Sequence, residues 1–481
     1  MRPFKNVFGN KPRMSVFDLS YEKKLTCDMG QLIPVLCDEV VPGDYWKIGN
    51  QAIIRMQPLV APVLHQIDVY VHYFFVPYRL LWDGFEDFIT NPDSEEVLPL
   101  WNPTKTEVGS LWDFLGFPLG VVPKGILPVD FPRRAYNYIW NEYYRDEDLQ
   151  TEVLLTNEDI LNRDWEKDYF TSARPWQQKG TPPALPITGI GHADFTRAMG
   201  GTTNSGYVVY DATKNLFLGN SLLPGINKND IDLSTATTFN VSDIRLAVSI
   251  QKWMERNARG GNRYIEFLKS HFGVNPKDER LQRPEYLGGT KVPIILSEVL
   301  QTSETGTTPL GQLGGHGIGV SSAYAAKAVV REFGLVIGLM SIMPKPAYMQ
   351  GVNRQWIKDT LYDFFFPEFV GISEQEVLRG ELYATAVEAD NKTVFGFQGR
   401  FDEMRYKPNL VVGEMRTVFD YWHLAREFAG APLLNDSFVK CNPDKRIFAV
   451  QNVPGFIVQF GNIIKALRPL PMVAEPGIGR I

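Results

Sequence analysis

The first seventeen residues combine positive charge with aromatic rings and contain no acidic residue. The charges are those of Arg2, Lys5, Lys11 and Arg13, and the rings are those of Phe4, Phe8 and Phe17. Cations follow the phosphates of single-stranded nucleic acid while rings stack on its bases, so this arm, residues 1–17, is a candidate nucleic-acid contact. The alternative is an ordinary solvated terminal segment.

The remaining polar residues form no recognisable catalytic or metal-binding motif. The sequence lacks a Walker loop, an HExxH pair, a nucleophile elbow and an EF-hand loop. The six histidines have no close pair, and a jelly-roll metalloenzyme would need a clustered histidine and carboxylate set. Adjacent acids such as Glu95 and Glu96 would point to opposite faces of a strand. We therefore predict no catalytic residue, no metal ligand, no cofactor and no enzymatic activity.

His72 and a glycine-rich run could suggest a functional site, but we interpret both as structural. His72 lies on the mixed face of a predicted strand, where a histidine with satisfied hydrogen bonds is expected. The glycine run GQLGGHGIGV, residues 311–320, lacks the third glycine of a dinucleotide loop and precedes a strand instead of a helix. We interpret this run as a flexible loop.

Charge and cysteine usage exclude several classes of protein. A net charge of −6 argues against a dedicated nucleic-acid binder, although a local basic patch is compatible with it. Cys27, Cys37 and Cys441 are odd in number and form no Cys-x-x-Cys pair, which predicts neither a disulfide framework nor a zinc site. We also expect no signal peptide, because the first thirteen residues, MRPFKNVFGNKPR, contain no continuous apolar region. We expect no membrane span, because Gly338 and Ser341 interrupt the longest apolar run.

The strongest structural pattern is the alternation in residues 66–77, QIDVYVHYFFVP. Every second residue from Ile67 to Phe75 is apolar, which predicts a strand with one face on a core. Phe74 and Val76 make the second face apolar toward the end, so we expect a central strand that becomes covered on both sides. Pro77 should end the strand.

Further strands are predicted near both ends of the chain, with helices between them. The predicted strands lie within 30–62, 291–300, 329–344, 446–453 and 455–471, and the predicted helices within 79–90, 132–149, 242–259 and 262–272. Neither group of strands can bury its apolar face alone. We therefore expect the early and late strands to share one core, with the helical middle inserted as loops.

The segment Thr181 to Val241 differs from its surroundings. It is rich in Gly, Thr, Asn, Pro and Ser and poor in charge, which favours a large surface excursion with one small hairpin. Loops of this size in an ordered protein are commonly either functional or disordered.

Several long motifs identify a family resemblance. They are FDLSYEKKLTCDMGQLIPVLCDEVVPGD, LVAPVLHQIDVYVHYFFVPYRLLWDGFEDFIT, DYFTSARPWQQKG, ERNARGGNRYIEFLKSHFGV and RLQRPEYLGG. In this order they resemble the major capsid proteins of Microviridae, specifically of the gokushovirus branch. The resemblance implies a mainly β fold, an eight-stranded antiparallel viral jelly-roll barrel with large helix-containing loop insertions, as one capsid domain over residues 1–481.

The resemblance also implies a function and partners. Family members form pentamers and a small T=1 icosahedral shell around circular single-stranded DNA, with an insertion loop projecting at the threefold axes. Residues 181–241 correspond to that loop by position and would face a host cell-surface receptor. An internal scaffolding protein and a DNA pilot protein are implied partners, with assembly in the host cytoplasm and final location in the virion. With this resemblance, the DNA-facing interpretation of the basic arm is favoured over the solvated one.

Two other classes of protein remain as alternatives. A carbohydrate-binding jelly roll, such as a phage fibre or a lectin, would share the β pattern but form a small oligomer. A cupin-like or glycoside-processing enzyme would need converging histidines or carboxylates at the mouth of the barrel.

Overall fold

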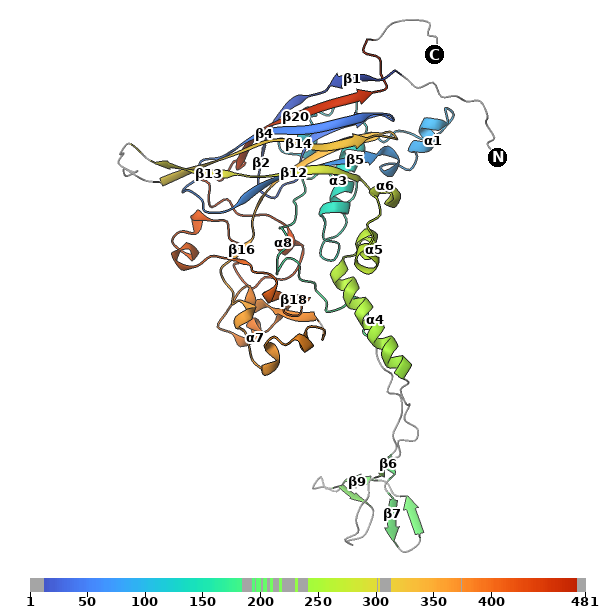
Figure 1. Cartoon of the computed structure of the whole chain (residues 1–481), viewed down its shortest axis with the longest axis vertical. Helices are drawn as coiled ribbons and strands as arrows, with labels where there is room; N and C mark the ends of the chain where they lie inside the picture. Colours follow the sequence, from blue (N-terminus) through green and yellow to red (C-terminus); the bar gives the residue numbers. More distant parts are fainter. Residues whose placement is uncertain are drawn as a thin grey trace. The chain divides into compact units, whose positions relative to one another are not determined.

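The strand predicted at residues 66–77 is β5, Ile67–Pro77, and it lies at the centre of a sheet. In this computed structural model, β5 pairs in antiparallel register with β12, Glu285–Pro293, on one side and β15, Gly334–Pro344, on the other (Figure 1). Phe74 and Val76 on its second face are buried, as the apolar end of the strand predicted.

The structure describes residues 13–183, 241–300, 302, 313–372 and 374–473, and between 193 and 231 the backbone of six short strands. The chain divides into two compact units. Unit 1 comprises Met1–Gln177 and Ala258–Ile481, and unit 2 comprises Gln178–Asn257.

Unit 1 is built on two antiparallel sheets, which makes the protein mainly β. The first sheet has the order β1-β20-β4-β14-β13, and β2 also pairs with β20. Its strands are β1 Ser15–Asp18, β2 Tyr21–Cys27, β4 Tyr45–Met56, β13 Ile295–Leu300, β14 Leu313–Val329 and β20 Phe456–Arg468. The second sheet has the order β12-β5-β15-β3, where β3 is Ile33–Val40.

The inner faces of the two sheets share one hydrophobic core. Ile48 and Phe460 of the first sheet and Val71 and Met340 of the second belong to the same buried cluster. The early strand β4 and the late strand β20 pair along their length, so the predicted joining of both chain ends in one core is confirmed.

The second sheet is covered on its other face as well. Phe74 and Leu335 pack there against Trp112 of α2, Leu111–Phe114, and Tyr136 of α3, Phe131–Ile139. A π-helical turn over Trp140–Tyr144 continues α3. The covering layer also includes α1, Phe85–Thr90, whose Phe85 packs against the same cluster. α1 lies within the predicted range 79–90 and α3 begins one residue before the predicted range 132–149, whereas α2 was not predicted.

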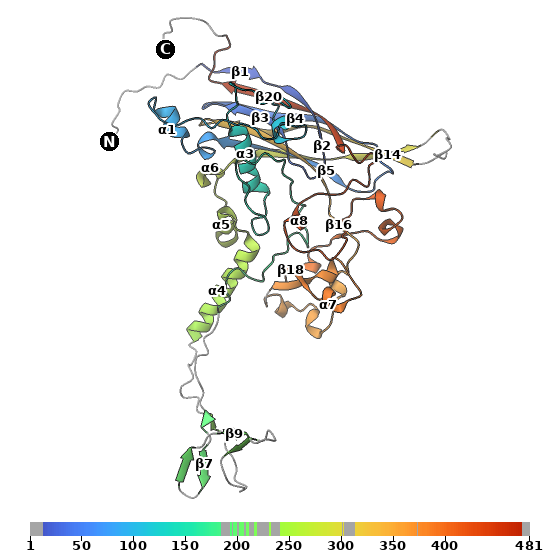
Figure 2. The same cartoon turned by 180° about the vertical axis from the view of Figure 1, so that it is seen from behind.

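The remaining elements of unit 1 are short. They are α5 Tyr264–Phe272, α6 Asp278–Leu281, α7 Glu388–Asn391, α8 Asp436–Val439, β16 Ala347–Tyr348, β17 Glu374–Leu378, β18 Val394–Gly399 and β19 Asn409–Leu410. Figure 2 shows α7, β18 and β16 grouped on the same side of the sheets. This group has its own buried cluster, which contains Tyr169, Val377 and Phe438.

Unit 2 contains most of α4, Val241–Gly260, where a helix was predicted. Its strands form three two-stranded antiparallel pairs, instead of the single hairpin expected. They are β6 Ala193–Asp194, β7 Thr196–Met199, β8 Thr202–Ser205, β9 Val208–Tyr210, β10 Leu216–Leu218 and β11 Asp230–Ile231. The side chains of residues 184–240 lie outside the described part of the chain.

Two further expectations were wrong. Residues 313–320 of the glycine run form the start of β14 and not a flexible loop. This segment pairs with β13 and β4, and it needs glycine because a Cβ atom at Gly315 would lie 2.8 Å from the carbonyl oxygen of Ala61. Residues 446–453 form no strand, although Phe448 makes an isolated bridge to Leu59.

The three cysteines are unpaired in the structure. Among the residues that the structure describes, no helix has the length and apolar character needed to span a membrane.

Candidate functional site: the anchor of the inserted unit

The chain leaves unit 1 after Gln177 and returns to it at Ala258. Arg174 lies just before the exit, and Asn262 and Arg263 lie just after the return. All three contact the acidic turn that follows α3, residues 145–148 with the sequence RDED. We call this set of polar contacts the anchor.

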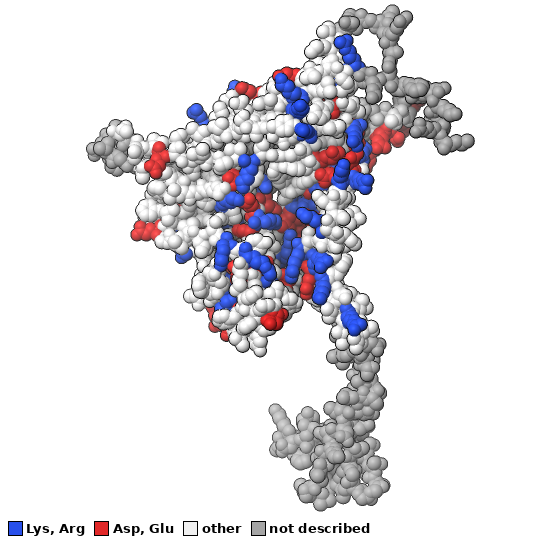
Figure 3. Space-filling model, viewed as in Figure 1, with Lys and Arg blue, Asp and Glu red and all other residues white. Residues whose placement is uncertain are grey.

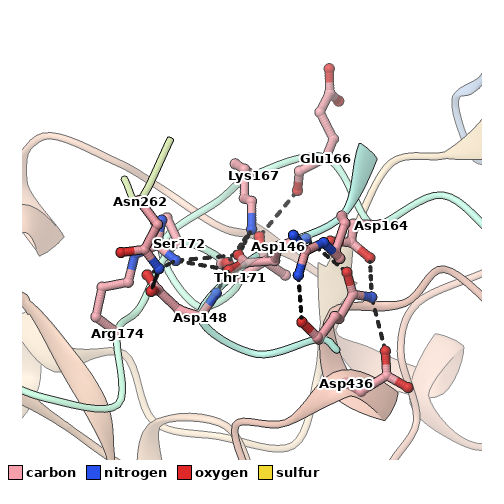
Figure 4. Close-up of polar contacts among 12 residues, drawn as sticks. Asp146, Asp148, Asp164, Glu166, Lys167, Thr171, Ser172, Arg174, Asn262 and Asp436 are labelled. Atoms are coloured by element: carbon pink, nitrogen blue, oxygen red, sulfur yellow. Dashed lines mark hydrogen bonds and ion pairs between the residues drawn. The ribbon is translucent and has the colours of Figure 1, made fainter. Parts of the chain in front are cut away.

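Asp146 is the centre of the anchor and binds two cations (Figure 4). Its Oδ2 lies 2.5 Å from Nζ of Lys167, and its Oδ1 lies 3.0 Å from Nη1 of Arg174. The same Nη1 lies 3.1 Å from Oδ2 of Asp148. One guanidinium therefore joins both aspartates of the turn to the segment that leads into unit 2.

The returning segment binds the other atoms of the turn. The side-chain amide of Asn262 donates a hydrogen bond to Oδ1 of Asp148. Nη2 of Arg263 donates to the carbonyl oxygens of Asn141 at 2.9 Å and Arg145 at 2.8 Å, and its Nε lies 3.2 Å from Glu147. The two carbonyls end the helical segment and lack intrahelical donors, so a guanidinium is well suited to this position.

Burial and charge act in opposite directions on these acids. Burial alone would raise the pKa of Asp146, but the charges of Lys167 and Arg174 outweigh it and lower this pKa below its ordinary value. Burial raises the pKa of Glu147, although Arg263 and Arg145 oppose the shift. Because Asp146 is held as an anion, the pairs that fix the outgoing segment persist at neutral pH.

A second buried carboxyl stands beside the anchor. Nε2 of Gln150 donates to Oδ1 of Asp164 at 2.9 Å and to Oδ1 of Asp436 at 2.9 Å. Burial raises the pKa of Asp164 to about 7, with Lys167 opposing this shift and the Asp146 carboxylate adding to it. Asp164 is therefore a titratable group near neutral pH within the framework that holds the acidic turn.

A cavity of about 640 Å³ opens next to the anchor and is lined by charges of both signs. Figure 3 shows Lys, Arg, Asp and Glu side chains gathered in the middle of the visible face, below the sheets. In its wall, Nδ1 of His72 lies 2.8 Å from the Tyr144 hydroxyl, so the structural interpretation of His72 is confirmed. Burial and the charge of Arg163 lower the pKa of His72 to about 4.

These charges largely satisfy one another. Within the described ranges, no three His, Cys, Asp or Glu side chains are arranged to hold a metal ion. The arrangement supports a mechanical role, because the segments before and after the long insertion both bind to the acidic turn at residues 145–148.

The predicted site residues lie elsewhere. Arg13 is described and lies two residues before the start of β1, whereas Arg2, Lys5 and Lys11 lie outside the described residues. Of the predicted loop Thr181 to Val241, Thr181 and Val241 are described as its ends. Sequence reasoning missed the anchor, although Arg174, Asn262 and Arg263 stand inside two of the motifs that carried the family resemblance.

The body of this chain is therefore β-rich, and ion pairs hold the segments on either side of its large insertion. Residues 5–478 match the sequence model of the family described as Capsid protein (F protein). The chain belongs to this capsid protein family.

Phage relatives agree with this assignment. The chain is 33% identical to Capsid protein VP1 of Chlamydia phage 1, over 99% of this chain and 98% of that protein. It is 33% identical to Capsid protein VP1 of Bdellovibrio phage phiMH2K and 30% identical to that of Spiroplasma virus 4, over at least 95% of each chain. All three are Microviridae. The protein is a capsid component with a structural role in the virion.

Proposed function

We propose that this chain is the major subunit of a T=1 icosahedral shell that encloses circular single-stranded DNA, and that its body is an eight-stranded jelly roll. The observation that carries the proposal is the strand order. We number eight strands in chain order: β2, β3, β4, β5, β12, β14, β15 and β20. One sheet then has the order first-eighth-third-sixth, and the other has the order second-seventh-fourth-fifth. Two interlocked Greek keys of this kind are typical of viral capsid domains.

Exposed apolar residues support assembly into pentamers and a closed shell. Trp356 is 75% exposed, and Leu361, Tyr362 and Phe364 are each more than half exposed. Apolar surface of this extent commonly marks contacts between proteins. A closed shell requires such patches to meet complementary surfaces on neighbouring copies.

Electron microscopy of the chain expressed with its internal scaffolding protein tests the assembly. We expect closed shells of uniform size. Small oligomers without shells would contradict the proposal and favour the carbohydrate-binding alternative. Glycan hydrolysis by converging carboxylates would favour the enzymatic one.

The basic arm is the proposed contact with packaged DNA. Arg2, Lys5, Lys11 and Arg13 recur in every subunit of a shell, so weak contacts add up through multivalency. Replacing all four by alanine should lower the temperature at which particles release DNA. Unchanged release, followed with a DNA-binding dye, would remove the arm from the function.

Residues 181–241 are the proposed receptor-facing loop at the threefold axes. The anchor supports this role, because it would transmit force from an attached loop to the body through Arg174 and Arg263. A DNA pilot protein completes the proposed set of partners, with assembly in the host cytoplasm.

A further inference from the structure

The two main sheets of unit 1 differ in what covers their outer faces. The outer face of the second sheet is buried under α2 and α3. On the first sheet, by contrast, Val320 is 62% exposed, Tyr324 56% and Ile457 50%. In Figures 1 and 2 the helices from α3 to α8 that belong to unit 1 lie on the side away from β1 and β20.

Three lysines form a row across this open face. Lys47 of β4 is directly opposite Lys465 of β20 on one side and Lys327 of β14 on the other, and all three are exposed. Adjacent strands lie about 4.8 Å apart, so the row is roughly 10 Å long. Like charges directly opposite one another destabilise a sheet, and an anionic partner would offset that cost.

In the described part of the chain, one acidic residue, Asp18, lies next to the lysine row, at its end. Asp18 of β1 is opposite Lys465, with 3.5 Å between its Oδ2 and Nζ of the lysine. Lys24 and Arg55 also point outward and add positive charge. The outward positions of β1, β2, β20, β4 and β14 hold one acid besides Asp18, which is Glu22. The face is therefore net basic on a chain of net charge −6.

An exposed ring accompanies the lysine row. The next outward row is Ile463, Gly49 and Tyr324, and Gly49 places no side chain between the other two. Nζ of Lys327 lies 5.9 Å from the centre of the Tyr324 ring. Proteins bind single-stranded nucleic acid with cations that contact its phosphates and with aromatic rings that stack on its bases. An acidic peptide would use the lysines but not the ring.

We propose that the outer face of the first sheet binds single-stranded DNA, with Lys47, Lys327 and Lys465 on the phosphates and Tyr324 stacked on a base. This inference rests on the proposed enclosure of single-stranded DNA and names the surface that contacts it. The basic arm joins the same edge of the sheet, because Arg13 lies two residues before Ser15, the first residue of β1.

The test compares two triple variants of the full-length protein. Lys47→Thr, Lys327→Thr and Lys465→Thr remove the row with a residue that suits strands. The control replaces three other exposed lysines, Lys124, Lys392 and Lys407, by threonine and changes the net charge equally. Binding of a fluorescent oligothymidylate is measured by anisotropy at about 50 and 200 mM salt.

The row variant should lose affinity, and its salt dependence should flatten. Each neutralised phosphate of a single strand contributes a slope of about −0.7 in log affinity against log salt, so three lysines contribute a roughly 20-fold fall over this range. The control should keep the wild-type slope. Without DNA, the row variant should unfold at an equal or higher temperature, because the repulsion between lysines is gone. Tyr324→Ala should weaken binding with no change in slope.

The inference would be overturned if the row variant bound oligothymidylate with the same affinity and the same salt dependence as the wild type. It would also be overturned if the control variant lost as much affinity as the row variant. Binding of poly-glutamate with no binding of oligothymidylate would assign the face to an acidic protein and overturn it too. Particle formation is scored separately by microscopy. Failure of the wild type to form shells would contradict the proposed function, whereas intact shells with unaltered DNA binding in the row variant would contradict only this inference.

Discussion

Asp164 is the residue at which pH and stability are most directly linked. Its pKa is about 7 in the folded chain against an ordinary value of 3.8, and burial is the main cause. Well below pH 3.8 the carboxyl is protonated in both states and burial costs little. As the pH rises toward 7, the unfolded chain loses its proton first, and the folded state loses stability.

Asp164→Asn should therefore stabilise the protein at pH 8 and change little near pH 4. The amide keeps an oxygen that accepts from Gln150 but never ionises. We expect a gain on the order of 2–4 kcal/mol at pH 8, from about 1.4 kcal/mol per pKa unit. Thermal unfolding across this pH range measures it, with the exposed Asp93→Asn as control. An equal effect of Asp164→Asn at both pH values would contradict the assigned titration.

At the scale of elements, periodic patterns were predicted well and close packing was not. The alternation in residues 66–77 contains the information for β5, because a strand with a buried face needs a repeat of two. The glycine run carries no such repeat of side chains. It is a strand because it pairs with β13 and β4. Glycine is needed at 315 because this residue meets the backbone of Ala61 and Pro62, more than 250 positions earlier in the chain. A contact at that separation leaves no local pattern.

Gly315→Ala should destabilise unit 1, whereas Gly314→Ala should not. A Cβ at Gly315 would lie 2.8 Å from the carbonyl oxygen of Ala61 and 2.9 Å from Cα of Pro62, so backbone must shift. We expect a loss of about 1–3 kcal/mol in the free energy of unfolding. At Gly314 the nearest atom is 3.6 Å away, which is ordinary contact. Denaturant unfolding of both variants compares them, and equal midpoints would refute the packing explanation.

The anchor also joins elements that are far apart in the chain, and for this reason the sequence did not reveal it. Arg174→Gln removes the guanidinium shared by Asp146 and Asp148, which are 4% and 2% exposed. We expect a loss of about 1–3 kcal/mol and faster amide exchange in residues 145–150 and 259–263. Lys392→Gln breaks the exposed pair with Glu388 and should have no measurable effect. Unchanged exchange in residues 145–150 would show that Arg174 does not stabilise the acidic turn to which both segments bind.

For the whole molecule, the division into two units predicts that shell formation and host attachment can be separated. The shared core and the anchor of unit 1 use no residue between 178 and 257. Replacing residues 185–238 by a short glycine-containing linker should therefore leave closed particles visible by electron microscopy and abolish adsorption to host cells. A chain with residues 185–238 in shuffled order keeps the size of the loop and should also fail to adsorb, which distinguishes recognition from bulk. Loss of particles in the trimmed chain would mean that the insertion takes part in assembly, and normal adsorption would place the receptor contact on unit 1.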